Sequence, residues 1–339
     1  YKIMDLQLRT SIIVPAYNSE KTIGECLKNI CLEASNFISE IIVIDDNSTD
    51  KTSEIVKNFK SVKLIKLEKN MGVGHARNLG AKMAKHETLC YIDSDLIITQ
   101  NSISNLIKKL YESDKIGSVS AIQEVTNLNL KNWSSNFVCL KSCYGFDDIK
   151  EEIEFTACAS EFCVMTKKML LQIGGWKSLR HAGGEEFDLG YKINLSGKIN
   201  LKIKNASYKA FYVSLYSRFK KIIDRTEKYI HIFLLKKKFD TQGSFATLNQ
   251  AFSCFFTFLL ILTLIFSLFF NEFNILRILI ILFFVQLIVE SKFLVFAKKH
   301  FGFKMLFFSF FGIQVINIGI LLGVGYFFLK LLNFRKKIS

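Results

Sequence analysis

Two acidic residues stand close together where a short apolar stretch ends. Asp93 and Asp95 follow Leu89–Ile92, with one serine between them. In an extended chain, residues two apart point the same way, so both carboxylates are expected on one face unless a turn intervenes. Neighbouring carboxylates repel each other unless a cation or a proton lies between them, and hard oxygen ligands suit Mg²⁺ or Mn²⁺. The pair therefore indicates a divalent metal site, and the alternative is a helix-capping pair in a surface turn.

A second acidic group follows two glycines further along the chain. Glu185, Glu186 and Asp188 stand where a helix is expected to begin, and the helix dipole favours acids there whatever their function. The functional alternative is that one carboxylate takes a proton from a hydroxyl group during catalysis. His181 lies nearby in the sequence and is a candidate contact for a metal or a substrate.

Other residues near the ends of apolar stretches could bind a phosphorylated ligand. Pro15, the single proline, cannot donate to a strand ladder and is expected to end the first strand. Tyr17 offers a ring on which a base could stack, or it packs beneath a loop. Gly72 and Gly74 allow close approach of the backbone, and Arg77 can pair with phosphate or be an ordinary surface charge.

These residues need a scaffold, and the first 200 residues alternate short apolar, β-branched stretches with helical patterns. That alternation predicts an α/β domain with a mostly parallel sheet. We expect strands at 11–14, 41–44, 62–67, 89–92 and 117–123, and helices at 20–34 and 74–84. Asn18 or Ser19 is expected to cap the first helix. Because open α/β sheets bind ligands at the carboxyl ends of their strands, the polar residues above are expected to meet there.

Charge is distributed unevenly along the 339 residues. The chain holds 45 Lys and Arg against 30 Asp and Glu, a formal charge of +15. Residues 1–200 are balanced at 25 of each sign, so the whole excess lies in residues 201–339. The eight cysteines lie mostly in apolar stretches without a zinc-type spacing to histidine, which favours buried thiols over disulfides or metal ligands. The first residues show no apolar signal core, which favours a cytosolic first half.

A basic stretch precedes the apolar part of the chain. Residues 202–238 carry eleven Lys and Arg, and 215–235 have the spacing of an amphipathic helix with a basic face. Such a face fits nucleic acid or an anionic lipid surface. Apolar segments follow at 251–270, 275–297 and 305–330, each of a length that suits a transmembrane helix. Because the basic stretch leads into them, we expect an anionic membrane surface as the partner and no nucleic acid.

The number of membrane crossings stays open at this point. The positive-inside rule places residues 202–238 and the lysines at 298–304 in the cytoplasm, and two crossings satisfy it. A third crossing would place the basic residues 335–337 outside, against the rule. We expect a multi-pass protein of the cell membrane with a cytoplasmic catalytic domain at 1–212. Amphipathic juxtamembrane helices are expected at 213–250 and the membrane region at 251–331.

Five stretches carrying these residues occur together in one order. They are SIIVPAYN (11–18), IIVIDDNSTD (41–50), NMGVGHARNLG (70–80), YIDSD (91–95), and IGGW with GGEEFDLGYKI (173–176 and 183–193). Together they resemble the family 2 glycosyltransferases, of the GT-A fold, over roughly residues 8–215. The resemblance implies a Rossmann-like catalytic domain that uses a nucleotide-diphosphate sugar, with UDP-sugars favoured.

The resemblance also assigns roles to individual residues. It makes Asp95 the direct ligand of Mn²⁺ or Mg²⁺, and it places Asp93 nearer the ribose and sugar of the donor, with His181 as a further metal candidate. Asp46 is implied to accept a hydrogen bond from a uracil-type N3–H. The donor-binding set is Pro15, Ala16, Tyr17, Asn18, Asp46, Gly72, Arg77 and Asp93. Trp176 and Asp188 are the expected acceptor contacts, and the alternative for Trp176 is a core aromatic.

Two positions depart from the family pattern. Glu186 stands where family members usually carry an aspartate base, and it is one methylene longer, with Glu185 as the neighbouring candidate. The histidine that often follows this pair is absent, and the matching stretch reads SYKAFYV (207–213).

The leading hypothesis is an inverting, metal-dependent, membrane-anchored glycosyltransferase whose acceptor is a hydroxyl group on a lipid or a lipid-linked saccharide. A polyprenyl-phosphate glycosyltransferase is the first alternative, although DSDLIITQNSI (93–103) lacks the Gln and paired prolines usual there. A processive synthase would show a QxxRW-like motif, and a nucleotidyltransferase a basic Gly-rich loop after the first strand. A nucleotide-binding but catalytically degenerate membrane scaffold would fit the two departures.

Overall fold

The computed structural model describes residues 9–33, 38–127, 132–146, 148–178, 184–236, 247–269 and 273–335. The chain divides into two compact units. The first comprises Tyr1–Leu128 and Asp148–Phe211, and the second comprises Asn129–Asp147 and Tyr212–Ser339. A short stretch from the middle of the chain therefore belongs with the C-terminal helices, and no sequence pattern had indicated this.

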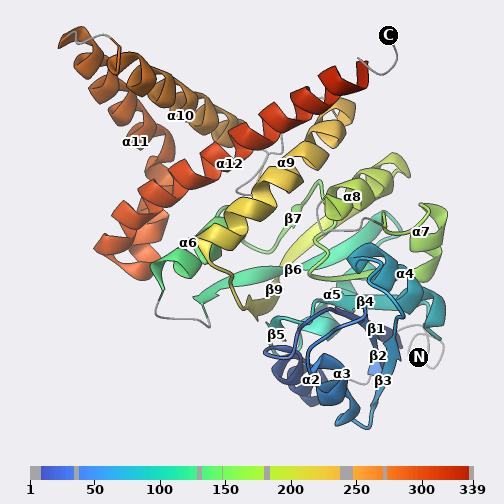
Figure 1. Ribbon diagram of the computed structural model, residues 1–339. Coiled ribbons are helices and arrows are strands. Elements are labelled where there is room, and N and C mark those ends of the chain that lie inside the picture. The colour runs from blue at the N-terminus through green and yellow to red at the C-terminus, as the bar shows by residue number, and fades with distance from the viewer. Residues whose placement is uncertain are drawn as a thin grey trace. The chain divides into compact units, whose positions relative to one another are not determined.

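The first unit is built on a nine-stranded sheet (Figure 1). The strands are β1 (Thr10–Ala16), β2 (Ile38–Asp45), β3 (Val62–Lys66), β4 (Thr88–Ile92), β5 (Leu96–Ile98), β6 (Ile116–Asn127), β7 (Glu152–Glu154), β8 (Phe162–Thr166) and β9 (Ile199–Ala210). Their order is β3-β2-β1-β4-β8-β6-β9-β5, and β7 pairs with β9. Strands β1 to β4 are mutually parallel, and among the described strands β5, β7 and β8 run opposite to the rest. The expected α/β fold with a mostly parallel sheet is confirmed.

Strand β1 lies inside the parallel block and is buried along its whole length. Its apolar, β-branched sequence is typical of a strand covered on both faces. The ladder with β2 continues through Ala16, whereas the ladder with β4 stops at Ile13. Pro15 therefore does not end the strand, contrary to the prediction. Its missing N–H is tolerated because the β4 ladder has already stopped.

Helices of the first unit pack on this sheet. They are α2 (Ile23–Leu32), α3 (Thr52–Lys57), α4 (Val73–Met83), α5 (Ser102–Leu110), α7 (Lys167–Gln172) and α8 (Glu185–Leu195). One core cluster joins side chains of β1, β2 and β4 to those of α4, α7 and α8. Helix α4 comes especially close to β1, because a Cβ on Gly80 would lie 2.4 Å from Cγ2 of Ile13.

Helix α2 begins later than the sequence predicted. It starts at Ile23 after Thr22, and no side chain caps it. The side-chain oxygen of Asn18 accepts from the backbone N–H of Thr49 (2.9 Å), and the Ser19 hydroxyl bonds to the Ser94 hydroxyl (2.8 Å). The predicted cap is wrong, because both side chains bind neighbouring loops instead of the helix.

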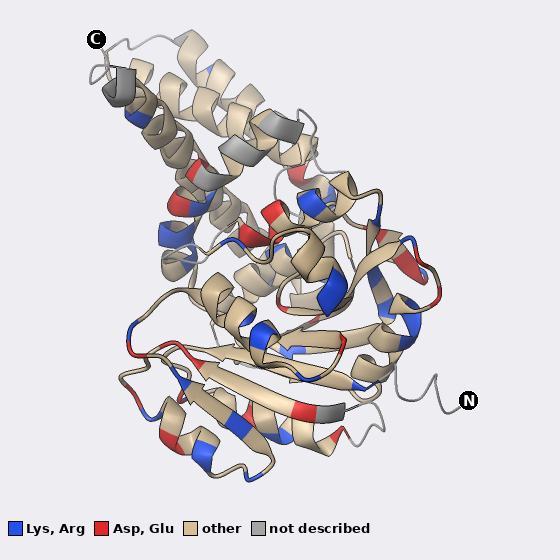
Figure 2. Ribbon diagram, turned by 90° about the vertical axis from the view of Figure 1, so that its right-hand side faces the viewer, with Lys and Arg blue, Asp and Glu red and all other residues tan. Residues whose placement is uncertain are grey.

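The second unit is helical. Its helices are α6 (Trp133–Cys143), α9 (Leu215–Lys236), α10 (Leu248–Ser267), α11 (Phe273–Phe301) and α12 (Phe303–Arg335). Among the described residues, three helices are long and apolar enough to cross a membrane, at Leu248–Ser267, Asn274–Phe301 and Phe303–Leu332. Figure 2 shows these helices almost entirely in tan, whereas charged residues are spread over the sheet unit. The three predicted apolar segments and the basic helix before them are confirmed as helices.

Candidate active site

Loops after β1, β2 and β4 are bonded to one another at the carboxyl edge of the parallel strands. The backbone N–H of Asn18 donates to Oγ of Ser48 (2.9 Å), while its side chain binds Thr49. The Ser19–Ser94 hydroxyl pair ties the loop after β1 to the turn after β4. These bonds bring together the loops that the sequence predicted would meet.

The nucleotide contacts expected from the first two loops differ in exposure. Tyr17 is 50% exposed, so its ring is open to a stacking partner, whereas Pro15 and Ala16 lie within buried β1. Asp46 is buried, and its two carboxylate oxygens accept from the backbone N–H groups of Met71 (2.7 Å) and Gly72 (2.8 Å). Asp46 therefore shapes the start of α4, and its contact with a base stays a prediction.

Glycines let the loop before α4 adopt its path. Gly72 has φ of +90°, a left-handed conformation that favours glycine, and it is the N-cap of α4. A Cβ on Gly74 would lie 2.2 Å from the carbonyl oxygen of Lys177. The expected close approach at Gly74 is thus an approach to the segment that precedes α8.

The acidic turn holds its two carboxylates in different surroundings. Asp93 donates its backbone N–H to the carbonyl of Glu161 (2.8 Å), and its side chain is 27% exposed. Asp95 is exposed, and its carbonyl oxygen accepts from the N–H of Phe211 (3.3 Å). Burial raises the pKa of the Asp93 carboxyl above its usual range, Arg77 opposes that shift, and Asp95 adds to it. The turn therefore offers one water-facing carboxylate and one that faces a cation.

That cation is Arg77 of α4, which is 1% exposed. Its Nη2 lies 2.7 Å from Oδ1 of Asp93, and its Nη1 lies 3.7 Å from Oε1 of Glu185. Burial alone would lower the pKa of the guanidinium, but these carboxylates outweigh it and hold the pKa above its ordinary value. Arg77 thus joins the acidic turn after β4 to the acidic start of α8. The sequence had predicted a phosphate contact for Arg77, and in this structure its charge is held by these two side chains.

Helix α8 presents the second acidic group. It begins after Gly184, whose φ is +84°, and Glu185 is buried beside Arg77. Glu186 is partly buried, and its carbonyl accepts from the N–H of Cys158 (3.0 Å). Asp188 pairs with Lys192 one turn later (2.8 Å), so its expected acceptor contact remains a prediction. The Glu185 carboxylate is therefore paired with Arg77, and Glu186 is the more accessible of the two candidate bases.

Trp176 lies in the core. It is 2% exposed, meets Tyr91 edge to face at 5.2 Å, and lies under the Arg77 guanidinium at 4.8 Å. Its backbone is held by Asn78 of α4, which accepts from its N–H (2.9 Å) and donates to its carbonyl (2.8 Å). In this structure the ring supports Arg77, and it is covered rather than open to an acceptor sugar.

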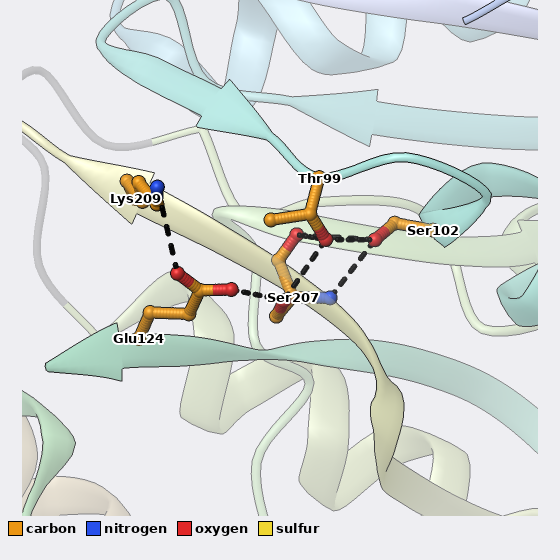
Figure 3. Close-up of polar contacts among 5 residues, drawn as sticks. All are labelled: Thr99, Ser102, Glu124, Ser207 and Lys209. Atoms are coloured by element: carbon orange, nitrogen blue, oxygen red, sulfur yellow. Dashed lines mark hydrogen bonds and ion pairs between the residues drawn. The ribbon is translucent and has the colours of Figure 1, made fainter. Parts of the chain in front are cut away.

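A polar network fixes the strand that follows the acidic turn. Figure 3 shows its members, Thr99, Ser102, Glu124, Ser207 and Lys209. The Ser207 hydroxyl donates to Glu124 (2.8 Å) and lies 2.9 Å from the Thr99 hydroxyl, while the Ser207 N–H donates to Ser102 (2.9 Å). Because β5 begins one residue after Asp95 and pairs with β9 here, the network sets where Asp95 lies.

The residues of the acidic turn fit a metal ion whose ligands come partly from the protein and partly from the substrate. No group of three or more His, Cys, Asp or Glu able to hold a metal occurs among the described residues. A Mg²⁺-type ion needs only one or two carboxylates when phosphate oxygens complete its coordination, and exposed Asp95 can supply one. His181, the third metal candidate, lies outside the described residues.

Comparison with known proteins identifies the domain. Residues 11–174 match the family described as Glycosyl transferase family 2. The chain carries a family 2 glycosyltransferase domain. Among curated relatives, glycosyltransferase GlyG of Streptococcus pneumoniae is 29% identical over 49% of this chain and 51% of its own length. Glycosyltransferase GlyA of the same organism is 30% identical over 66% of this chain and 33% of its own length.

The solved structures agree on the fold. The mannosyltransferase PcManGT from Pyrobaculum calidifontis, in complex with GDP-Man and Mn²⁺, has a TM-score of 0.57 and 16% identity, and the likeness covers 94% of this chain and 87% of that one. GalNAc-T7 with UDP, GalNAc and Mn²⁺ has a TM-score of 0.51 and 18% identity, over 67% of this chain and 48% of that one. The alignments with GlyG and GlyA span about half or less of those relatives.

The glycosyltransferase domain also relies on residues that the sequence analysis did not single out. Asn78 clamps the segment before α8, and Ser48 and Ser94 bind the loop after β1. Asn78 stands within one of the quoted motifs, and a polar amide on the packed side of α4 was the signal that could have indicated its role. The two serines stand in Asx- and Ser-rich turns, where side chains commonly bind nearby backbone.

Proposed function

We propose that this chain is an inverting glycosyltransferase that moves a sugar from a nucleotide-diphosphate sugar, with UDP-sugars favoured, to a hydroxyl group of a lipid-linked or membrane-associated acceptor. One observation carries the proposal: Arg77 contacts both the acidic turn and the acidic start of α8. Because Arg77 pairs with carboxylates from two distant parts of the chain, it holds the expected donor-binding turn next to the helix that carries the candidate base.

In this proposal Glu186 is the general base. It takes the proton of the acceptor hydroxyl while the hydroxyl oxygen attacks the anomeric carbon of the sugar. The bond from that carbon to the diphosphate oxygen breaks on the opposite face, so the configuration inverts and the nucleoside diphosphate leaves. Glu185 is held by Arg77 and positions the start of α8, which is why we favour Glu186.

The donor occupies the edge formed by the loops after β1, β2 and β4. Tyr17 stacks on the base, and Asp93 faces the ribose and sugar. Asp95 would hold Mg²⁺ or Mn²⁺, and such an ion would neutralise charge on the leaving diphosphate. The structural neighbours support a nucleotide donor and a divalent ion, since GalNAc-T7 was solved with UDP and Mn²⁺ and PcManGT with GDP-Man and Mn²⁺.

The helical unit motivates the membrane part of the proposal. Three apolar helices follow basic helix α9, and a basic face next to apolar helices favours an anionic cytoplasmic leaflet. A site anchored there meets lipid-linked acceptors directly. The poly-beta-1,6-N-acetyl-D-glucosamine synthase of Staphylococcus epidermidis, 26% identical over 49% of this chain, supports a role in assembling envelope saccharides.

The test is a donor screen on the full chain in detergent, with UDP- and GDP-sugars, Mn²⁺ and membrane lipids, read by mass spectrometry of the lipid product. Asp95→Asn and Glu186→Gln are each expected to lower turnover by about 10²-fold or more. Asp114→Asn, a change at another exposed aspartate, is the control and should leave turnover unchanged. Donor binding without turnover in the wild-type chain would favour the degenerate scaffold, and transfer to a polyprenyl phosphate would favour that alternative acceptor.

A further inference from the structure

Helix α9 is packed along the C-terminal half of α12. A Cβ on Gly319 would lie 3.1 Å from Cδ2 of Phe219, and a Cβ on Gly323 would lie 2.7 Å from Cβ of Thr226. Further along, Lys330 pairs with Glu227 (2.8 Å). Gly319 and Gly323 therefore let α9 pack closely against α12, and the contact extends from Gly319 to Lys330.

The sequence of α9 conflicts with a place in the bilayer core. Seven charged residues fall between positions 218 and 228: Arg218, Lys220, Lys221, Asp224, Arg225, Glu227 and Lys228. If the C-terminal half of α12 crossed the membrane, α9 would be carried with it, and each of these charges would be costly in hydrocarbon. The packing is compatible with α12 and α9 lying together at the membrane surface, where charged side chains reach water or lipid headgroups.

The other half of α12 is covered by α6. Trp133 stacks on Phe308 at 5.0 Å, and a Cβ on Gly312 would lie 2.8 Å from the ring of Phe137. Buried residues make up 39% of the most apolar window of α12, against 22% in α10 and in α11. Of the three long apolar helices, α12 is therefore the one whose surface is most occupied by protein.

Helices α10 and α11 are less covered by protein than α12. Helix α10 contains no charged residue, and large apolar side chains of both helices are exposed, including Phe258, Leu264, Phe266, Ile281 and Phe284. In Figure 1 the two helices run side by side and diverge from α12. This pair presents to its surroundings the all-round apolar surface that a membrane-spanning hairpin needs.

A buried polar network joins the middle of α12 to α10 and α11. Asn317 of α12 donates to Ser253 and Thr257 of α10 (2.8 Å each), and Gln286 of α11 donates to Thr257 (3.0 Å). The network involves the first half of α10 and the middle of α11. The part of α11 that follows Gln286 carries the basic residues Lys292, Lys298 and Lys299, which the positive-inside rule places in the cytoplasm.

We propose that the membrane is crossed only by the α10–α11 hairpin, and that α12 lies with α9 along the anionic cytoplasmic surface. Two crossings place the basic residues 202–238, 298–304 and 335–337 on one side, which removes the conflict that three crossings create. The inference rests on the membrane attachment in the proposed function and gives it a topology. The partner of the α9–α12 pair is the anionic lipid headgroup layer.

The test places single cysteines in the full chain in native membranes. Cys31→Ser serves as the parent, because Cys31 is the one exposed cysteine of the eight. Reporters are Tyr216→Cys on α9, Phe269→Cys beyond α10 and Leu332→Cys on α12, all at exposed positions. With a membrane-impermeant maleimide, positions 216 and 332 should react in inverted vesicles and be protected in intact cells. Position 269 should show the reverse.

Labelling at 332 from the same side as 269, or from neither side, would overturn the proposal. A second arm tests the α9–α12 contact in the membrane. Thr226→Cys with Gly323→Cys should form a disulfide on mild oxidation, whereas Thr226→Cys with Gly325→Cys should not, since nothing lies within 4 Å of a Cβ on Gly325. Absence of the first disulfide would also overturn it.

Neither arm needs catalytic turnover, so the topology can fail while the proposed activity stands. A chain recovered outside the membrane fraction would instead contradict the membrane attachment in the proposed function, and with it this inference.

Discussion

Replacing Arg77 with methionine tests whether one buried guanidinium holds the acidic turn and α8 together. The change keeps an unbranched apolar stem and removes the charge that lies 2.7 Å from Asp93 and 3.7 Å from Glu185. The side chain of Glu185 is 4% exposed, so its carboxylate would lose a buried partner. Removing one partner of a buried ion pair costs about 3–5 kcal/mol.

For a domain of this size, that loss corresponds to a fall in Tm of roughly 6–20 °C. The assay is thermal unfolding of the purified full chain in detergent, alongside turnover with the best donor. Lys82→Met, an exposed change on the same helix, is the matched control and should shift Tm by less than about 1–2 °C. Turnover should fall with Arg77→Met, because Arg77 would no longer hold Asp93 and the start of α8 in their relative positions.

A double variant separates charge from packing. If the penalty is the uncompensated carboxylate, Arg77→Met should cost less in a Glu185→Gln background, because no buried charge then remains at that position. Equal penalties in both backgrounds would assign the loss to packing on Trp176. A Tm and a turnover for Arg77→Met equal to those of the Lys82→Met control would refute the reasoning altogether.

Three further changes address other parts of the chain. Burial raises the pKa of Glu33 to about 7, so its contribution to stability is present at low pH and is lost as pH rises from about 4.5 through 7. Glu33→Gln should remove that pH dependence and stabilise the chain at pH 8 by about 1–3 kcal/mol. Equal slopes of Tm against pH in the variant and the wild-type chain would contradict this. Gly74→Ala should lower stability by about 1–3 kcal/mol and reduce turnover, since its Cβ would meet the Lys177 carbonyl at 2.2 Å; unchanged Tm and kinetics would count against the close approach. Asn317→Leu should lower the Tm of the detergent-solubilised chain, at a cost of about 1–3 kcal/mol, because the hydroxyl groups of Ser253 and Thr257 stay buried and lose the amide that pairs with them. A Tm that is unchanged or higher would show that the network adds no stability.

Much of the fold could be predicted because its signals are local. The strand expected at 89–92 is β4 (Thr88–Ile92), the helix expected at 74–84 is α4 (Val73–Met83), and the basic helix expected at 215–235 is α9 (Leu215–Lys236). Apolar periodicity and β-branched content act over a few neighbouring residues, so a single sequence carries them. The meeting of the loops at one edge followed from the parallel order of the strands.

The partners of individual polar groups could not be predicted in the same way. Arg77 and Asp46 are polar at positions where both a ligand and a buried protein partner are chemically reasonable, and sequence spacing does not distinguish them. The structure gives Arg77 two carboxylates and gives Asp46 two backbone N–H groups. These contacts depend on loops that are distant in the chain, which local patterns do not report.

The sequence by itself determined the family 2 glycosyltransferase motifs, the parallel strands that gather them, and the separation between a charge-balanced first part and a basic, apolar second part. Only the tertiary structure decided that Trp176 is covered by Arg77 and Tyr91, that residues 129–147 belong with the C-terminal helices, and that α9 lies on the glycines of α12. The physical reason is the range of the interactions: composition and periodicity act along the chain, whereas burial and the pairing of charges are settled by which distant segments come to lie side by side.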